Sequence, residues 1–265
     1  MQVPCGQCIG CRLARSQEWA VRCVHEAQLH DENCFVTLTY DDSELPQFGE
    51  LRKDHFQCFM KRLRKSISPK RVRFFHCGEY GETNQRPHYH ALLFGYAPND
   101  REVHSERDGV VLYTSTKLAA LWGKGFVTIG EVTFESAAYV ARYTMKKLNG
   151  ERYFAPLIDF STGEIFELEN VYATMSRNPG IGNSWFKDFK SDVFPDDFVV
   201  LNGRRYRPPR YYGKLLEATH SEEYEEMKQR RQQVAKERAE DNTTERLVVR
   251  EEVQHAKVNK LVRTL

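Results

Sequence analysis

This sequence of 265 residues lacks long apolar runs. No stretch approaches the ~20 consecutive apolar residues that a membrane-spanning helix needs. The opening residues 1–4 also lack the basic and then apolar order of a secretory signal peptide. Internal repeats are absent as well. These absences favour a cytoplasmic protein without a membrane partner, and a composition of 40% hydrophobic and 29% charged residues is typical of a globular chain with a sizeable core.

A strong net charge is also missing, because 39 basic residues are nearly balanced by 37 acidic ones. The average conceals two basic blocks: residues 52–73 contain a single acid, Asp54, and residues 204–214 contain none. Stripes of one sign are the electrostatic footprint of phosphate binding, although most charge runs are simply solvated faces. From these two blocks we predict DNA contacts by Arg62, Arg64, Lys65, Arg204, Arg205 and Arg207.

The cysteines lack the even number and spacing of a disulfide framework. Of the seven, Cys5, Cys8 and Cys11 follow one another at three-residue spacing, with glycines between them that let the backbone fold around an ion. This spacing is typical of metal ligands and fits a reducing compartment. We predict a structural Zn²⁺ site with Cys23 as the fourth ligand and His25 as the alternative. Three reduced thiols at the start of a helix are the competing interpretation.

Hydrophobic periodicity predicts helices and strands in turn over the first 150 residues. Apolar residues recur at helical spacing over 13–27 and 51–67, whereas β-branched and aromatic residues mark a strand over 34–40. A second strand, 71–77, precedes a polar, glycine-containing turn at 78–85. The other predicted segments are a looser stretch over 98–109, a helix over 115–122, a strand over 125–130 and a helix over 136–147.

The most informative stretch is Arg86-Pro-His-Tyr-His-Ala-Leu-Leu-Phe-Gly95. Alternate side chains of a strand point to opposite faces, so His88 and His90 would share one face. Two neighbouring imidazoles can bind one divalent ion, and Glu79 in the preceding turn can add a carboxylate, with Glu82 as the competing third ligand. Such a site leaves positions open for substrate oxygens and can polarise a phosphoryl group.

Tyrosines mark the predicted helix over 136–147. Tyr139, Tyr143 and Lys146 stand at positions i, i+4 and i+7, so they share one helix face. A phenol can attack phosphorus and form a covalent ester. Its pKa near ~10 makes deprotonation costly unless a positive charge is close. We therefore predict that catalysis uses the tyrosines and the basic residues beside them: Tyr139, Tyr143, Arg142, Lys146 and Lys147.

The C-terminal third changes character. Residues 151–215 combine short strand-like pieces with glycines, arginines and aromatic residues, which suits contact with a phosphate chain and with bases, or equally a loop packed under the core. Residues 216–265 are dominated by Glu, Lys, Arg and Gln. That composition indicates a solvated helix or a partly disordered tail.

Five motifs together resemble one family. They are Cys5-Gly-Gln-Cys-Ile-Gly-Cys-Arg12, Gly78-Glu-Tyr-Gly81, Arg86-Pro-His-Tyr-His90, Tyr139-Val-Ala-Arg-Tyr143 and Ser176-Arg-Asn-Pro-Gly-Ile-Gly182. Each is a weak signal alone, but their order and spacing are specific. From its start to about residue 215 the chain resembles the HUH endonucleases, and among them the rolling-circle replication initiators of gokushovirus-type single-stranded DNA phages of the Microviridae.

The resemblance implies an α+β fold, in which helices flank a central antiparallel sheet and a charged helical tail follows. It implies an enzyme of the host bacterial cytoplasm that uses Mn²⁺ or Mg²⁺ to nick one strand at the viral origin, forms a 5′-phosphotyrosine adduct and later religates by strand transfer. The implied partners are single-stranded and supercoiled origin DNA and the host helicase and polymerase. By position, the motifs match metal ligands at His88, His90 and Glu79, nucleophiles at Tyr139 and Tyr143, and an assisting lysine at Lys146.

These patterns together predict four regions. Residues 1–33 would hold the cysteine cluster and the first helix, and residues 34–150 the HUH nuclease core. Residues 151–215 would form an extension packed on that core and offering a DNA contact. Residues 216–265 would form the charged tail, helical or disordered.

Two other functions share parts of this pattern. A non-catalytic, zinc-stabilised single-stranded DNA-binding protein would use the basic blocks for phosphates and the histidines for a structural ion. A conjugative or plasmid relaxase would share the nicking chemistry, but it usually carries a third histidine, which the sequence does not show near His88 and His90. Metal-dependent cleavage distinguishes the nicking enzymes from the binding protein.

Overall fold

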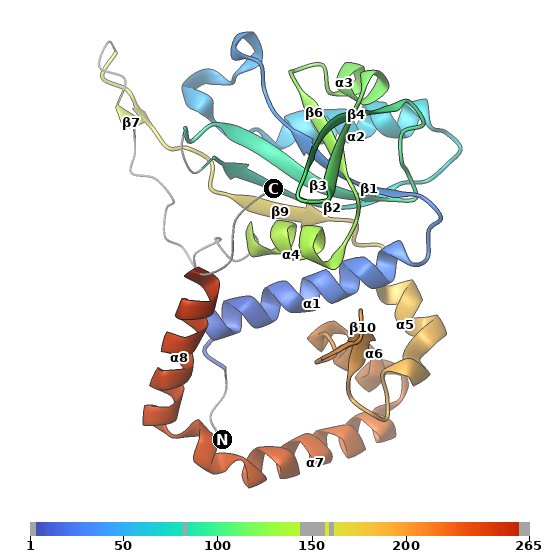
Figure 1. Ribbon diagram of the computed structural model, residues 1–265, viewed down its shortest axis with the longest axis vertical. Coiled ribbons are helices and arrows are strands. Elements are labelled where there is room, and N and C mark those ends of the chain that lie inside the picture. Colours follow the sequence, from blue (N-terminus) through green and yellow to red (C-terminus); the bar gives the residue numbers. More distant parts are fainter. Residues whose placement is uncertain (1–3, 82–83, 144–156, 159–161, 260–265) are drawn as a thin grey trace. The chain divides into compact units, whose positions relative to one another are not determined.

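The computed structural model contains two compact units (Figure 1). One spans Arg22–Trp185, and the other combines Met1–Val21 with Phe186–Leu265. The predicted boundaries after residues 33, 150 and 215 differ from this division and stay predictions. Among the helices described, none is long and apolar enough to cross a bilayer. The described residues are 4–81, 84–143, 157–158 and 162–259.

A seven-stranded antiparallel sheet forms the centre of the first unit (Figure 1). The strand order is β4-β5-β6-β1-β3-β2-β9, so β3 is hydrogen-bonded to β1 on one side and to β2 on the other. This arrangement, with helices beside the sheet, confirms the predicted α+β class. The strands are β1 (Asn33–Leu38), β2 (Arg73–Tyr80), β3 (Pro87–Phe94), β4 (Arg101–Arg107), β5 (Val110–Ser115), β6 (Val127–Gly130) and β9 (Tyr172–Met175).

One face of the sheet carries the main hydrophobic core. Tyr89 and Leu93 of β3 and Leu38 of β1 belong to it. Helices α2 (Lys53–Ser66) and α3 (Thr116–Trp122) cover this face. The apolar residues of α2 recur at the three- and four-residue spacing that turns one helix stripe towards a core. The buried side chains of α2 are Phe56, Phe59, Met60 and Leu63.

The opposite face of the sheet is in contact with α4 (Phe134–Tyr143), which packs against β2 and β3 (Figure 1). Strand alternation sends Thr37, Glu79 and His90 towards this face, because their neighbours Leu38, Tyr80 and Tyr89 belong to the core on the other side. The α4 side is therefore where polar and titratable side chains of the central strands gather.

Strand β2 is longer than the sequence predicted. The prediction ended it at Cys77 and placed Glu79 in a turn, whereas the strand continues through Glu79 to Tyr80. The reason is long-range: Gly78 pairs with Tyr172 of β9, and a Cβ at Gly78 would lie 2.8 Å from the Tyr172 ring. The glycine that suggested a turn instead lets an aromatic side chain from a distant strand pack against β2.

The predicted looser stretch over 98–109 was also wrong, because its second half forms a hairpin with the following residues. Strands β4 and β5 pair antiparallel through a turn at Asp108 and Gly109, whose φ values are 51° and 76°. Positive φ at both central residues is the geometry of a tight hairpin turn, for which Asp-Gly is a preferred pair.

The remaining elements include two that continue across the division between the units, α1 (Ile9–Ala27) and α5 (Asn183–Phe189). Short pieces are β7 (Leu157–Ile158), β8 (Ile165–Phe166) and the 3-10 helices Asp42–Glu44, Gln47–Gly49, Lys190–Asp192 and Ala239–Asn242. The second unit also holds β10 (Val199–Leu201), β11 (Arg204–Tyr206), α6 (Arg210–Thr219), α7 (Ser221–Glu237) and α8 (Thr244–Asn259).

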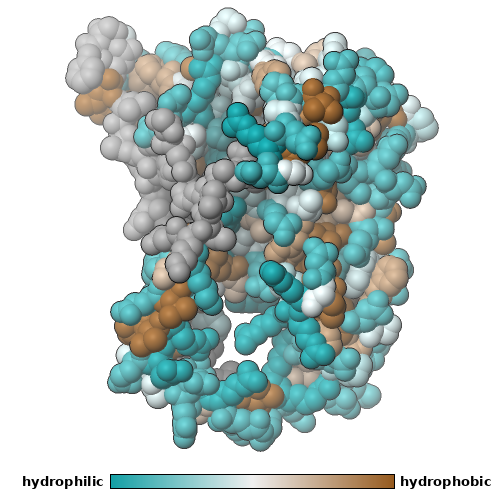
Figure 2. Space-filling view, in the orientation of Figure 1, coloured by the Kyte–Doolittle hydropathy of each residue, from teal (hydrophilic) through white to brown (hydrophobic). Residues whose placement is uncertain are grey.

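The charged C-terminal region is helical, as one of the two predicted alternatives stated. Helix α7 packs against α6 and buries Met227, and Arg231 donates to both carboxylate oxygens of Asp197 at 2.6 and 2.7 Å. Helix α8 differs, because its apolar residues face outwards as a patch on the surface (Figure 2). The exposed apolar residues of α8 are Leu247, Val248, Val249 and Val253.

A buried carboxylate ties β2 to the segments behind it. Glu26 of α1 is 2% exposed, accepts a hydrogen bond of 2.7 Å from the amide of Gly182 and is paired with the guanidinium of Arg73 on β2. Burial alone would raise the pKa of Glu26, but hydrogen bonds from His30, Gly182 and Arg73 and the positive charge of Arg73 bring it below its ordinary value.

We expect Glu26→Gln to lower the free energy of unfolding by about 3 kcal/mol at pH 7, because Arg73 would lose its buried partner. A carboxylate whose pKa is lowered by folding stabilises the protein above its unfolded-state pKa, and this stabilisation is lost as the pH falls through the folded-state pKa. Urea unfolding curves of wild type and variant should therefore converge below about pH 4. Glu32→Gln removes only an exposed partner of Lys70 and should change stability little. Equal effects of the two substitutions would contradict this account.

Candidate metal and nucleophile site

Glu79, His88 and His90 converge on the α4 side of the sheet. The Oε1 atom of Glu79 lies 2.9 Å from Nε2 of His88 and 2.8 Å from Nε2 of His90. The antiparallel register explains this, because Glu79 of β2 stands directly opposite His88 of β3. The three side chains offer ligand atoms within 4.8 Å of one another, and they can therefore hold one divalent ion.

The two imidazoles are held from behind. Nδ1 of His88 donates to the backbone carbonyl of Arg86 at 3.1 Å, and Nδ1 of His90 lies 2.9 Å from the hydroxyl of Thr37. The ring of Phe35 stacks on that of His90, with centroids 5.5 Å apart. Partners on Nδ1 orient Nε2 towards a metal. Sequence reasoning did not assign Thr37 and Phe35 to the site, although strand alternation on β1 could have placed them on one face.

Burial and hydrogen bonding set the charge state of the ligands. Burial lowers the pKa of His90, which keeps its imidazole neutral near neutral pH. Burial would raise the pKa of Glu79, but hydrogen bonds from His88 and His90 bring it below its ordinary value. A neutral imidazole and an ionised carboxylate are the forms that bind a divalent cation.

Tyr139 of α4 reaches the same carboxylate. Its phenol donates a hydrogen bond to Oε1 of Glu79 at 3.4 Å, and its ring meets the ring of His90 edge to face, with centroids 5.0 Å apart. The guanidinium of Arg142 lies 5.4 Å from the centre of the Tyr139 ring. A phenol, a cation and three metal-binding groups therefore meet within one small volume, which is the arrangement that phosphoryl transfer to a tyrosine requires.

Several predicted site residues lie outside the described residues. Glu82, the competing third ligand, is one of them, so only Glu79 is placed beside the histidines. The backbone of Tyr143 ends α4 one turn after Tyr139, and its side chain lies outside the description. Lys146 and Lys147 lie outside it as well.

The first basic block lies on α2, which covers the sheet face opposite the Glu79, His88 and His90 cluster. Arg62 donates to the carbonyls of Leu121 and Trp122, at 2.6 and 2.8 Å. Arg62 therefore caps the end of α3. The guanidinium of Arg64 lies 5.6 Å from the centre of the Phe74 ring, and Lys65 is exposed. A DNA contact by these residues stays a prediction.

The second basic block belongs to the second unit. Arg204 and Arg205 lie on β11, and Arg207 follows it; all three are exposed. The guanidinium of Arg205 lies 4.4 Å from the centre of the Phe198 ring. Their predicted DNA contact is likewise untested.

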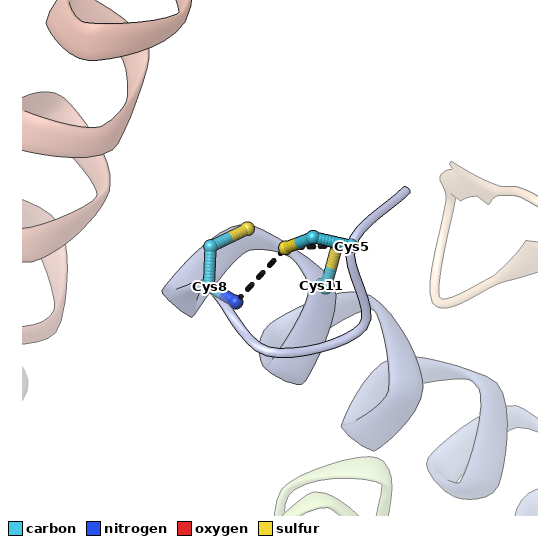
Figure 3. Close-up of side chains that lie close together, drawn as sticks. All are labelled: Cys5, Cys8 and Cys11. Atoms are coloured by element: carbon cyan, nitrogen blue, oxygen red, sulfur yellow. Dashed lines mark hydrogen bonds between the residues drawn. The ribbon is translucent and has the colours of Figure 1, made fainter. Parts of the chain in front are cut away.

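Cys5, Cys8 and Cys11 come together at the start of α1 (Figure 3). Cys23 does not join them, contrary to the prediction, because it stands twelve residues after Cys11 on the same helix, a rise of about 18 Å. The alternative ligand, His25, stacks on Trp185 with centroids 3.5 Å apart, and burial lowers its pKa to about 3. Hydrogen bonds from the amides of the cluster lower the pKa of Cys5 to about 7.

Comparison with known proteins identifies the family. The family model that describes the ORF2 type of replication-associated protein matches residues 33–148, the stretch that holds the Glu79, His88 and His90 cluster and α4. No solved structure matches the chain.

Curated relatives cover most of the chain. Replication-associated protein VP4 of Bdellovibrio phage phiMH2K is 34% identical over 232 residues, which cover 84% of this chain and 70% of the relative. Replication-associated protein ORF2 of Spiroplasma virus 4 is 34% identical over 250 residues, covering 88% and 74%. Replication-associated protein ORF4 of Chlamydia phage 1 is 33% identical over 231 residues, covering 84% and 55%. The chain therefore belongs to the ORF2 family of replication-associated proteins and is a homologue of the replication-associated proteins of the Microviridae.

Proposed function

We propose that this protein is a metal-dependent endonuclease and strand transferase that initiates rolling-circle replication by nicking one DNA strand at the viral origin. The observation that carries the proposal is the hydrogen bond between the Tyr139 phenol and Glu79, the carboxylate that also contacts His88 and His90. A nucleophile within one hydrogen bond of a metal ligand would lie close to a phosphate bound at the metal. Membership in a family of replication-associated proteins supports the same substrate.

The reaction is a transesterification. A bound Mn²⁺ or Mg²⁺ would polarise the scissile phosphoryl group. The Tyr139 oxygen forms a bond to phosphorus as the bond to the 3′ oxygen breaks, so the phenol loses a proton and the released 3′ hydroxyl gains one. Arg142 beside the ring favours the phenolate that forms. One phosphodiester replaces another, so strand transfer can later reverse the step without an external energy source.

Two tyrosines one turn apart give a route for religation. While Tyr139 holds the 5′ end, Tyr143 on the same helix would attack the next origin copy, and the freed 3′ hydroxyl would reseal the first strand. The assisting charges would come from Arg142, Lys146 and Lys147. This assignment rests on the spacing in the sequence.

The proposal includes the setting of the reaction. The protein would act in the cytoplasm of the host bacterium on single-stranded and supercoiled origin DNA. The 3′ hydroxyl that the nick leaves would prime host polymerase, and host helicase would unwind the strand. The replication-associated relatives support this setting through their phage origin.

The adduct tests the nucleophile. Incubation of the protein with single-stranded origin DNA and Mn²⁺ should give a protein–DNA species that survives a denaturing gel. Tyr139→Phe should slow its formation about 10³-fold, because the phenol oxygen is lost. Tyr113→Phe alters a tyrosine of β5 and should leave the rate unchanged. An adduct that still forms in the Tyr139→Phe, Tyr143→Phe double variant would rule out both tyrosines.

Metal removal tests the ligands. EDTA should abolish cleavage and leave DNA binding intact, and Glu79→Gln should weaken Mn²⁺ binding by about 10–100-fold, because a neutral amide replaces the carboxylate between the two histidines. Calorimetric titration with Mn²⁺ measures the affinity. His104→Ala changes a histidine of β4 and is the matched control. DNA binding without any metal-dependent cleavage would instead favour the non-catalytic DNA-binding function.

A further inference from the structure

The cysteine cluster has the dimensions of a metal site. Cys5 and Cys8 lie just before α1 and Cys11 in its first turn, and Figure 3 shows their sulfur atoms turned towards one another. The three Sγ atoms lie within 4.8 Å of one another, and those of Cys5 and Cys11 are 3.9 Å apart. Sulfurs bound to tetrahedral Zn²⁺ at ~2.3 Å lie about 3.8 Å apart. A disulfide would instead need ~2.05 Å.

The surroundings of the sulfurs favour thiolates. The backbone amides of Gln7 and Cys8 donate to Sγ of Cys5 at 3.4 and 3.3 Å. Helix α1 has no acidic residue in its first turn, although negative charge is stabilising at a helix N-terminus. Thiolates of Cys8 and Cys11 would supply that charge.

The three cysteines also differ from most of the others. Cys5 is exposed and Cys8 and Cys11 are partly exposed, whereas the other cysteines apart from Cys58 are buried. Buried cysteines pack as small apolar side chains, but exposed ones that converge are available to an ion. No fourth Cys, His, Asp or Glu joins the three within the described part of the chain.

We propose that Cys5, Cys8 and Cys11 bind one structural Zn²⁺ ion through three thiolates, with a fourth position taken by water or by a ligand from outside the described residues. The ion would fasten the segment 5–8 to the first turn of α1. This soft, sulfur-only site is chemically distinct from the nitrogen and oxygen ligands of Glu79, His88 and His90, and the proposal does not depend on the nicking activity.

The full-length protein with Co²⁺ in place of Zn²⁺ tests the proposal. We expect a thiolate-to-cobalt charge-transfer band in the near ultraviolet and about one Zn²⁺ per chain released when thiols are blocked. Cys11→Ser should weaken Co²⁺ binding about tenfold or more and reduce the band. Cys58→Ser removes an exposed cysteine of α2 and should keep it. The His88→Ala, His90→Ala variant should keep it too, because the band reports sulfur ligands alone.

Three outcomes would overturn the proposal. The first is a wild-type cobalt spectrum without charge transfer, which decides the matter even if the cysteine variants fold poorly. The second is an equal band in Cys11→Ser and Cys58→Ser. The third is a Cys5–Cys11 disulfide, found by mass spectrometry, in protein purified under reducing conditions.

Discussion

The site depends on the antiparallel pairing of β2 and β3. This register sets Glu79 opposite His88, and strand alternation then adds His90 two residues later on the same face. A slip of one residue would turn all three ligands into the hydrophobic core. The register is fixed on both sides, since β3 also pairs with β1 and β2 with β9. The sheet therefore acts as a rigid mount for the metal ligands, and α4 brings Tyr139 to them.

Tyr89, the residue between the two histidines, anchors the strand from its other side. Its phenol is hydrogen-bonded to the hydroxyl of Tyr40 at 2.7 Å and to the backbone amide and carbonyl of Arg52 at 2.9 and 3.0 Å. Alternate residues of β3 thus have different tasks: the histidines face the reaction side, and the tyrosine fixes the strand to the core. Such support holds ligands at the geometry that catalysis needs.

Features encoded locally were predictable from the sequence. Two-residue periodicity placed His88 and His90 on one face, and helical spacing placed α2 and most of α4. Features that depend on distant residues were not. The extension of β2 through Glu79 needs Tyr172 against Gly78, and the role of Arg62 needs the end of α3 beside it. The β4–β5 hairpin is different, because its Asp-Gly turn was a readable signal.

The most direct test of the account is to locate the covalent nucleotide. Trypsin cuts after Arg142, so Tyr139 falls in the peptide 125–142 and Tyr143 in the peptide 143–146. After reaction with single-stranded origin DNA and Mn²⁺, nuclease trimming and digestion, mass spectrometry should find a nucleotide on the peptide 125–142. Absence of a nucleotide from that peptide, in protein that has cleaved the DNA, would contradict the assignment of Tyr139 as the nucleophile beside Glu79.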